Sequence, residues 1–282
     1  MDAPASVLSL VLLETGVGGL ALLWLAPTWR KVRHGYEILL GTTLFLMLWG
    51  AWAAIGTPLQ TVVDSVGVTP AALDAVTWST RLMGWATVLA LLSVIAIVAK
   101  APAAGRVLGF AALAVGLASF VPLGALRASR GVPGGTVQGF AELLLGAFLL
   151  GAIWDGMILG HWYLVEKRLS NRYMQWMAWA NVAAVVAGLV AVGLSVRNPV
   201  PCAGEVGDAL TACVYNFSPL LSVGNLTITM GVGVLALVAL IAGFNVKLAN
   251  EGGRSIQAST GMFYLAVILA PAAEFAAKVR FF

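Results

Sequence analysis

Long, uninterrupted runs of apolar residues dominate this chain, and polar positions fall mainly between them. The runs 88–98 and 232–244, for example, contain no charged residue. Only helices and closed barrels satisfy every backbone hydrogen bond in lipid, and barrel strands alternate apolar and polar residues over about 10 positions. The pattern therefore predicts an all-α transmembrane bundle of eight spans, at 6–26, 36–55, 79–99, 106–126, 136–163, 173–195, 220–245 and 257–277.

The composition places the whole chain, 1–282, in one integral membrane domain. Hydrophobic residues make up 60% of it and charged residues 10%, with a mean hydropathy of +0.94. Soluble domains average roughly 45–50% apolar and about 25% charged residues, and disordered chains are less apolar still. Both classes are therefore excluded. The first span is expected to be a membrane helix rather than a cleavable signal peptide, because Asp2 precedes it and Glu14 lies within it.

The distribution of basic residues predicts the orientation of the protein in the membrane. The turns after the first, third, fifth and seventh spans carry ten of the sixteen Lys and Arg residues, and the other side carries six. Because basic loops favour the cytoplasmic side, we expect both termini on the outer, periplasmic side of the cell (inner) membrane. The basic turns also explain the pI of 9.3 and favour contact with anionic lipid.

Two cysteines, Cys202 and Cys213, fall in the long loop between the sixth and seventh spans. On the predicted orientation this loop faces an oxidising compartment, so we expect a disulfide that closes a short lid. The loop has no histidine, and no metal site is expected there. The other long outer loop is predicted to contain a short interfacial helix, 70–76, with Thr69 as its N-cap.

The order of features along the chain predicts an internal duplication, with halves 1–131 and 135–282. In each half the first span is followed by a basic turn, 28–34 in the first and 166–172 in the second. A long outer loop follows the next span in both halves. Because each half has an even number of spans, the two would share one orientation and be related by an axis along the membrane normal.

Four acidic residues lie within the predicted spans, and each is a functional candidate because an ionisable group in lipid costs about 2.5–3.5 kcal/mol on the mildest scale. Glu14 lies near the middle of the first span and Asp155 well inside the fifth; we interpret both as proton-coupling or ligand-coupling acids, with buried packing carboxyls as the alternative. Glu142 is expected near the outer interface. Glu274 is expected to form an ion pair with Lys278 near the outer surface, from their i,i+4 spacing.

The two histidines, His34 and His161, lie at the inner ends of their spans in corresponding parts of the two halves. A haem b in a bundle usually takes two axial ligands, commonly histidines, so the pair is the minimum for that cofactor. His161, followed by Trp162 and Tyr163, is also a candidate to bond a quinone carbonyl or a lipid head group. The alternatives are a solvated His34 and a His161 that only caps its helix.

No phosphate loop, HExxH motif, CxxC pair or haem-attachment motif occurs in the sequence, and nucleic-acid binding has no support. Three classes of function stay open. The first is a non-catalytic subunit of a respiratory-type electron-transfer complex, which contacts other membrane or redox subunits and a quinone or haem. The second is a small proton-coupled transporter or channel with Glu14 and Asp155 as coupling acids. The third is a structural or assembly protein of the membrane. We do not expect catalysis by this chain alone.

Overall fold

The computed structural model describes residues 3–26, 28, 31–32, 34–66, 69–129, 131–166, 168–198, 205–217 and 224–281. These residues form helices and turns, with no β-strand among them. The helices are α1 (Ala3–Leu25), α2 (His34–Val66), α3 (Pro70–Val98), α4 (Pro102–Ser129), α5 (Gly135–Val165), α6 (Arg172–Ser195), α7 (Gly207–Phe217), α8 (Gly224–Glu251) and α9 (Ser255–Lys278).

All of these helices except α7 contain a segment long and apolar enough to cross a membrane, which confirms the eight predicted spans. The shortest such segment, Ala5–Leu25, has 21 residues. At 1.5 Å per residue it is about 31 Å long, close to the ~30 Å hydrocarbon core of a bilayer. The chain is therefore a multi-pass all-α membrane protein.

The predicted interfacial helix at 70–76 is wrong as a separate element. These residues are the first turns of α3, and α2 continues to Val66, so most of the predicted loop is helical. The predicted cap is confirmed, because the Thr69 hydroxyl oxygen accepts a hydrogen bond of 3.2 Å from the Ala72 backbone N–H. Pro70 occupies the first helical turn, where its missing N–H has no intrahelical partner to lose. A single long helix therefore replaces a loop, a short helix and a span.

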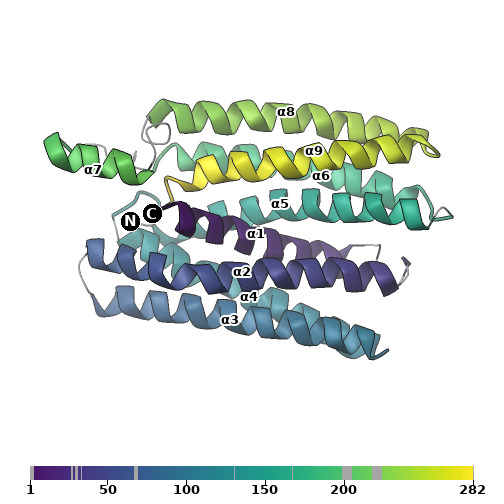
Figure 1. Ribbon diagram of the computed structural model, residues 1–282, viewed down its shortest axis with the longest axis horizontal. Coiled ribbons are helices and arrows are strands. Elements are labelled where there is room, and N and C mark those ends of the chain that lie inside the picture. The colour runs from purple at the N-terminus through teal and green to yellow at the C-terminus, as the bar shows by residue number, and fades with distance from the viewer. Residues whose placement is uncertain are drawn as a thin grey trace.

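The helices lie side by side, with α1 and α5 in the centre of the bundle (Figure 1). In their apolar segments 83% and 78% of the residues are buried, against 33–50% in the other spans. Helices α2, α3 and α4 lie on one side of this pair and α6, α8 and α9 on the other, while α7 projects at the end where both termini lie. The central pair is therefore shielded from lipid over most of its surface.

The contacts among the spans follow one order twice. In the first half α1 contacts α2, α2 contacts α3, α3 contacts α4, and α4 returns to α1. In the second half α5, α6, α8 and α9 contact one another in the same closed order, and α1 packs on α5 between the halves. This matched order supports two four-helix repeats as a proposal.

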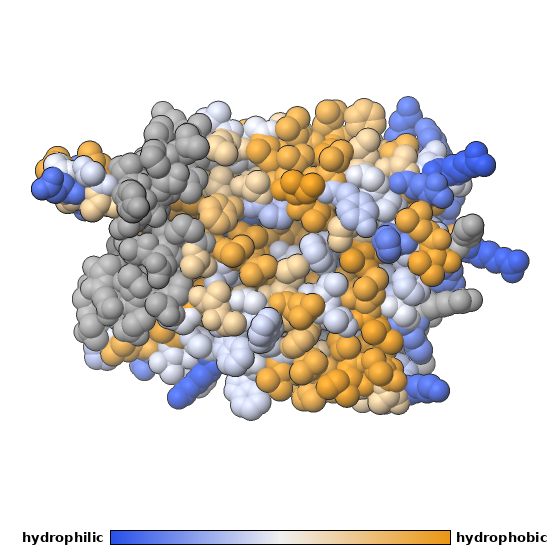
Figure 2. Space-filling model, viewed as in Figure 1, coloured by the Kyte–Doolittle hydropathy of each residue, from blue (hydrophilic) through white to orange (hydrophobic). Residues whose placement is uncertain are grey.

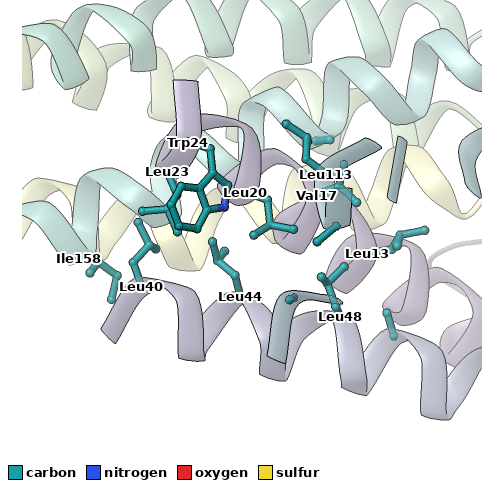
Figure 3. Close-up of a cluster of buried hydrophobic side chains, with 14 of the residues drawn as sticks. Leu13, Val17, Leu20, Leu23, Trp24, Leu40, Leu44, Leu48, Leu113 and Ile158 are labelled. Atoms are coloured by element: carbon teal, nitrogen blue, oxygen red, sulfur yellow. The ribbon is translucent and has the colours of Figure 1, made fainter. Parts of the chain in front are cut away.

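Leucine and valine side chains at helical spacing fill the space between α1 and α2. Leu13, Val17 and Leu20 from α1 meet Leu44 and Leu48 from α2 (Figure 3). In α2 these two leucines are four residues apart, so they lie on one face of the helix. Because lipid tails are as apolar as leucine, close packing rather than exclusion of water stabilises this contact.

The outer surface of the bundle is apolar over its middle and hydrophilic at one end (Figure 2). Large apolar side chains there include Ile95, Val107, Leu237, Leu240 and Ile268, each at least half exposed. Hydrophilic side chains gather at the end where α1 finishes and α2 begins, which we call the basic end. The apolar belt is the surface that a bilayer would cover.

Candidate functional site: a buried ion cluster and an isolated carboxyl group

The site is built around the contact of α1 with α5, which is close enough to exclude side chains. A Cβ added at Gly18 of α1 would lie 1.7 Å from the Ala147 carbonyl oxygen, and one at Gly151 of α5 would lie 2.3 Å from the Gly18 carbonyl carbon. Small residues at a membrane helix contact allow the two backbones to approach in this way. Polar side chains that flank the contact are thereby held inside protein and away from lipid.

Gly146, the residue before Ala147, leaves room for two carboxyl groups. A Cβ added there would lie 2.6 Å from Oε1 of Glu14 on α1 and 2.5 Å from Oε1 of Glu274 on α9. The Lys278 ammonium lies 3.0 Å from Oε1 of Glu14 and forms a second ion pair with Glu274. It also donates a hydrogen bond of 3.1 Å to the Glu142 carbonyl oxygen. Three helices therefore converge on one lysine.

The predicted Glu274–Lys278 pair is present, and the structure shows that it is buried inside the bundle. The side chains of Glu274 and Lys278 are at most 1% exposed. The pair is buried because α1 and α5 cover it, a tertiary contact that the i,i+4 spacing does not reveal. Glu14 belongs to the same cluster, where its ion-pair partner is Lys278. Its role as a coupling acid stays a prediction.

A second group of polar side chains continues from Glu142 to the end of the bundle that holds the termini. Arg127 of α4 lies 3.3 Å from Oε1 of Glu142, and it donates hydrogen bonds to the carbonyl oxygens of Pro133 and Gly135 at 3.2 and 3.0 Å. It also donates a hydrogen bond to the side chain of Asn198 in the turn after α6. The Asn198 amide in turn donates to Oε2 of Glu142 at 3.1 Å.

Gln138, one turn before Glu142 on α5, completes this group. Its amide donates hydrogen bonds of 2.8 Å to Oε1 of Glu142 and 2.9 Å to the Leu194 carbonyl oxygen of α6. Glu142 is 1% exposed, so its side chain is buried inside the bundle, and its depth near the outer interface stays a prediction. Two helices and a turn surround this carboxyl group with donors, which is the environment that a buried carboxylate requires.

Phe281 lies beside the cluster, shortly after the end of α9, and Arg280 precedes it without forming an ion pair with the cluster acids among the described residues. The Phe281 ring lies 5.6 Å from the Arg127 guanidinium carbon and 5.9 Å from the Lys278 nitrogen, at cation–π distance from both. Burial lowers the pKa of Arg280. Within the described part of the chain its Nε and Nη1 atoms have no hydrogen-bond partner.

Asp155 lies deeper along α5 and differs from the other acids. Its carboxyl group is fully buried, and neither oxygen has a hydrogen-bond partner among the described residues. It faces α1, because a Cβ added at Gly19 would lie 3.1 Å from its Oδ1. Tyr36 of α2 is also buried. An uncompensated carboxyl group at this depth is far more stable neutral than charged.

The two histidines have different partners at the basic end of the bundle. The His34 side chain is half exposed, and its Nδ1 atom lies 3.2 Å from Oε2 of Glu37 on the same helix. His161 is exposed, and its Nδ1 atom lies 3.3 Å from the hydroxyl oxygen of Tyr264 on α9. The structure therefore gives each ring its own protein partner, and the prediction that they bind haem or quinone stays a prediction.

Trp162 and Tyr163 hold the turn between α5 and α6. The Trp162 indole donates a hydrogen bond of 3.1 Å to Oε2 of Glu166. The Tyr163 hydroxyl donates one of 2.5 Å to the Ser170 carbonyl oxygen and accepts one of 3.2 Å from the Met174 backbone N–H. These bonds give both residues a structural role, which the aromatic pattern alone did not identify.

The predicted disulfide lies outside the described residues. Cys202 is not described, and of Cys213 only the backbone, within α7, is described. The bond between them stays a prediction.

Sequence reasoning missed Arg127, Gln138 and Asn198 as members of the site. Arg127 lies one residue beyond the predicted fourth span, so it was counted as a loop residue. The spacing of Gln138 and Glu142, four residues apart inside an apolar segment, was an available signal for a polar helix face. Nothing local marks Asn198, because its partners come from other helices.

Searches against family models, curated proteins and solved structures found no match for this chain. The fold and the site therefore define its class, a multi-pass α-helical membrane protein with a buried ion cluster between its two central helices.

Proposed function

We propose that this protein moves protons through its α1–α5 core as a small proton-coupled transporter or channel, with Glu14 and Asp155 as the coupling acids. The observation that carries the proposal is the charge balance of the core. Three buried acids, Glu14, Glu142 and Glu274, share the cluster with two bases, Arg127 and Lys278. Deeper in the same helix pair Asp155 has no hydrogen-bond or ion-pair partner among the described residues.

The excess of acids over bases gives the cluster a place for a proton. With these three acids and two bases ionised, the ion-paired groups carry one net negative charge, which is unfavourable in a medium of low dielectric constant. One bound proton makes them neutral. Lys278 lies between Glu14 and Glu274, so either carboxyl group can hold that proton while the other keeps its ion pair. Such a group gains and loses a proton with little rearrangement.

Asp155 is the second proton-binding group along the helix pair, and it lies nearer the basic end than the ion cluster does. It faces Gly19, and five residues of α1 separate Gly19 from Glu14, a rise of about 7.5 Å. This step is longer than a hydrogen bond, so a proton must cross it through water or through a movement of α1 against α5. Tyr36 and Glu37 are buried polar groups in the first turn of α2, at the basic end.

The position of the acids at the boundary of the two proposed repeats supports the same function. In many transporters built from repeated halves, the coupling site lies near the midplane where the halves meet. Here α1 and α5 are the first helices of the two halves, and they carry Glu14 and Asp155. The proposed orientation, with both termini outside, would make the ion cluster the outer level and Asp155 the inner level.

Proton flux into liposomes tests the proposal. Purified protein is reconstituted with a trapped pH-sensitive dye, and a potassium diffusion potential set with valinomycin drives protons inward. We expect proton uptake above that of protein-free liposomes. Asp155→Asn and Glu14→Gln should each abolish it, because an amide cannot carry a proton between the two levels.

Asp74→Asn is the matched control, because Asp74 is an exposed carboxyl group on α3. It should leave the flux unchanged. The proposal is contradicted if the wild-type protein shows no flux, or if both core variants conduct like the wild type.

An electron-transfer subunit is the second candidate, favoured by one observation. His161 is exposed next to Tyr264 at the basic end, where a quinone head group would reach it from lipid. Absorption spectra of the oxidised and dithionite-reduced protein test it, since a Soret band lost on replacing His34 or His161 would indicate haem. A colourless protein that copurifies with redox subunits would favour a quinone site instead.

A further inference from the structure

An apolar groove opens to lipid between the central helices and α4 and α6. Its volume is about 400 Å³, and its walls include Val17 and Ala21 of α1, Leu117 of α4, and Leu144 and Phe148 of α5. Along α1 the groove runs from Val17 to Leu25. Eight residues of helix rise about 12 Å, which is close to half of the ~30 Å hydrocarbon core. The groove therefore has the depth of one leaflet.

A basic pocket continues this groove at the basic end of the bundle. It has a volume of about 450 Å³ and is lined by Leu25, Lys31, Arg172, Tyr173 and Trp176. Leu25 and Trp176 also line the groove, so the two spaces share a wall. Lys31 comes from the turn after α1 and Arg172 from the first turn of α6, so the pocket joins the two proposed halves.

The two cations are available to a ligand. Both residues are exposed, and within the described part of the chain neither side chain forms an ion pair. The Tyr173 hydroxyl adds a hydrogen-bond donor to the same pocket. The apolar groove together with the basic pocket matches an amphiphile that has a hydrocarbon chain and an anionic head group.

We propose that this combined site binds an anionic phospholipid from the leaflet at the basic end. The phosphate lies between Lys31 and Arg172, and one acyl chain fills the groove against Phe148 and Trp176. Basic pockets between membrane helices bind anionic head groups in this way. A neutral quinone head group could accept hydrogen bonds from the two cations but would leave them without a countercharge, and a free phosphate would leave the groove without a ligand.

Lipid titration of the purified protein in detergent tests the proposal. Native mass spectrometry measures the binding of phosphatidylglycerol and of phosphatidylcholine with the same acyl chains. We expect phosphatidylglycerol to bind more tightly to the wild-type protein. Lys31→Gln and Arg172→Gln should each weaken it about fivefold, the factor that about 1 kcal/mol per basic residue predicts, and should leave phosphatidylcholine unchanged.

Lys247→Gln and Arg254→Gln are the matched controls, because both residues are exposed at the basic end but line neither space. They should keep wild-type affinity. Ala21→Phe fills the groove and leaves the two cations in place, so it should weaken binding of the whole lipid. Helix content and elution volume confirm that each variant is folded.

Equal binding of the two lipids, or equal weakening by the control variants, would overturn the proposal. Inorganic phosphate distinguishes a lipid site from a simple anion site. If phosphate at the concentration of the lipid displaces phosphatidylglycerol, or if Ala21→Phe binds lipid normally, the groove does not hold an acyl chain and the proposal is wrong. None of these readouts depends on proton transport.

Discussion

The Lys278 ammonium on the last turn of α9 lies 3.0 Å from the Glu14 carboxylate on α1, and both side chains are at most 1% exposed. This ion pair joins the first and last helices of the chain. Lys278 also pairs with Glu274 and bonds to the Glu142 carbonyl oxygen, so α1, α5 and α9 meet at one ammonium group.

Removal of Lys278 is expected to destabilise the protein strongly. Lys278→Met leaves Glu14 and Glu274 buried without a cation, and breaking a buried pair from one side typically costs about 3–5 kcal/mol. Denaturant unfolding in detergent, followed by tryptophan fluorescence, measures the loss. Lys247→Met on exposed α8 is the control and should change stability by less than about 0.5 kcal/mol.

The coupling between Lys278 and Glu14 is expected to be visible in a double-mutant cycle. Because both variants remove the same ion pair, Glu14→Gln combined with Lys278→Met should lose less stability than the two single losses added together. The expected difference is about 0.5–3 kcal/mol. Strict additivity would show that the two groups do not interact in the folded protein.

The close contact of α1 and α5 should not tolerate a methyl group. Gly18→Ala places a Cβ 1.7 Å from a backbone oxygen, so the helices must move apart and the bundle should lose stability. Gly193→Ala is the control, because a Cβ there meets nothing within 4 Å. In a helix interior that change should be neutral or stabilising by about 0.5–1 kcal/mol. Thermal unfolding of both variants measures the contrast, and equal behaviour would contradict the packing described.

Tyr163 is expected to stabilise the turn between α5 and α6 through its hydroxyl group. Tyr163→Phe removes the bonds to the Ser170 carbonyl oxygen and the Met174 N–H, at about 1 kcal/mol each. Amide hydrogen exchange of residues 166–174 should become faster. Tyr264→Phe on the exposed face of α9 is the control, and exchange in the turn should not change.

The orientation in the membrane is expected to place the basic end in the cytoplasm. In a Cys202→Ser, Cys213→Ser background, Arg254→Cys should react with a membrane-impermeant maleimide only after the cells are opened. Asp208→Cys on α7 should react in intact cells, since α7 lies at the opposite end. The reverse pattern would invert the proposed topology.

The sequence by itself determined the fold class and the number of spans. An apolar segment of about 20 residues is a local property, and because it lacks the alternation of a barrel strand, the helix is the backbone arrangement that suits it in lipid. The i,i+4 pair of Glu274 and Lys278 was equally local and is present. Glu14 and Asp155 were recognised for the same reason, because an acid inside an apolar run is conspicuous at any position.

Only the tertiary structure decided what these acids contact. Glu14 and Lys278 lie at opposite ends of the chain, and no spacing rule connects them. Asn198 and Arg127 were classed as loop residues until the bundle brought them to Glu142. The physical reason is that pairing between helices depends on which faces meet and how closely, and here Gly18, Gly146 and Gly151 set that distance. A glycine's role in such a contact is defined by its neighbour across the interface, which the linear sequence does not contain.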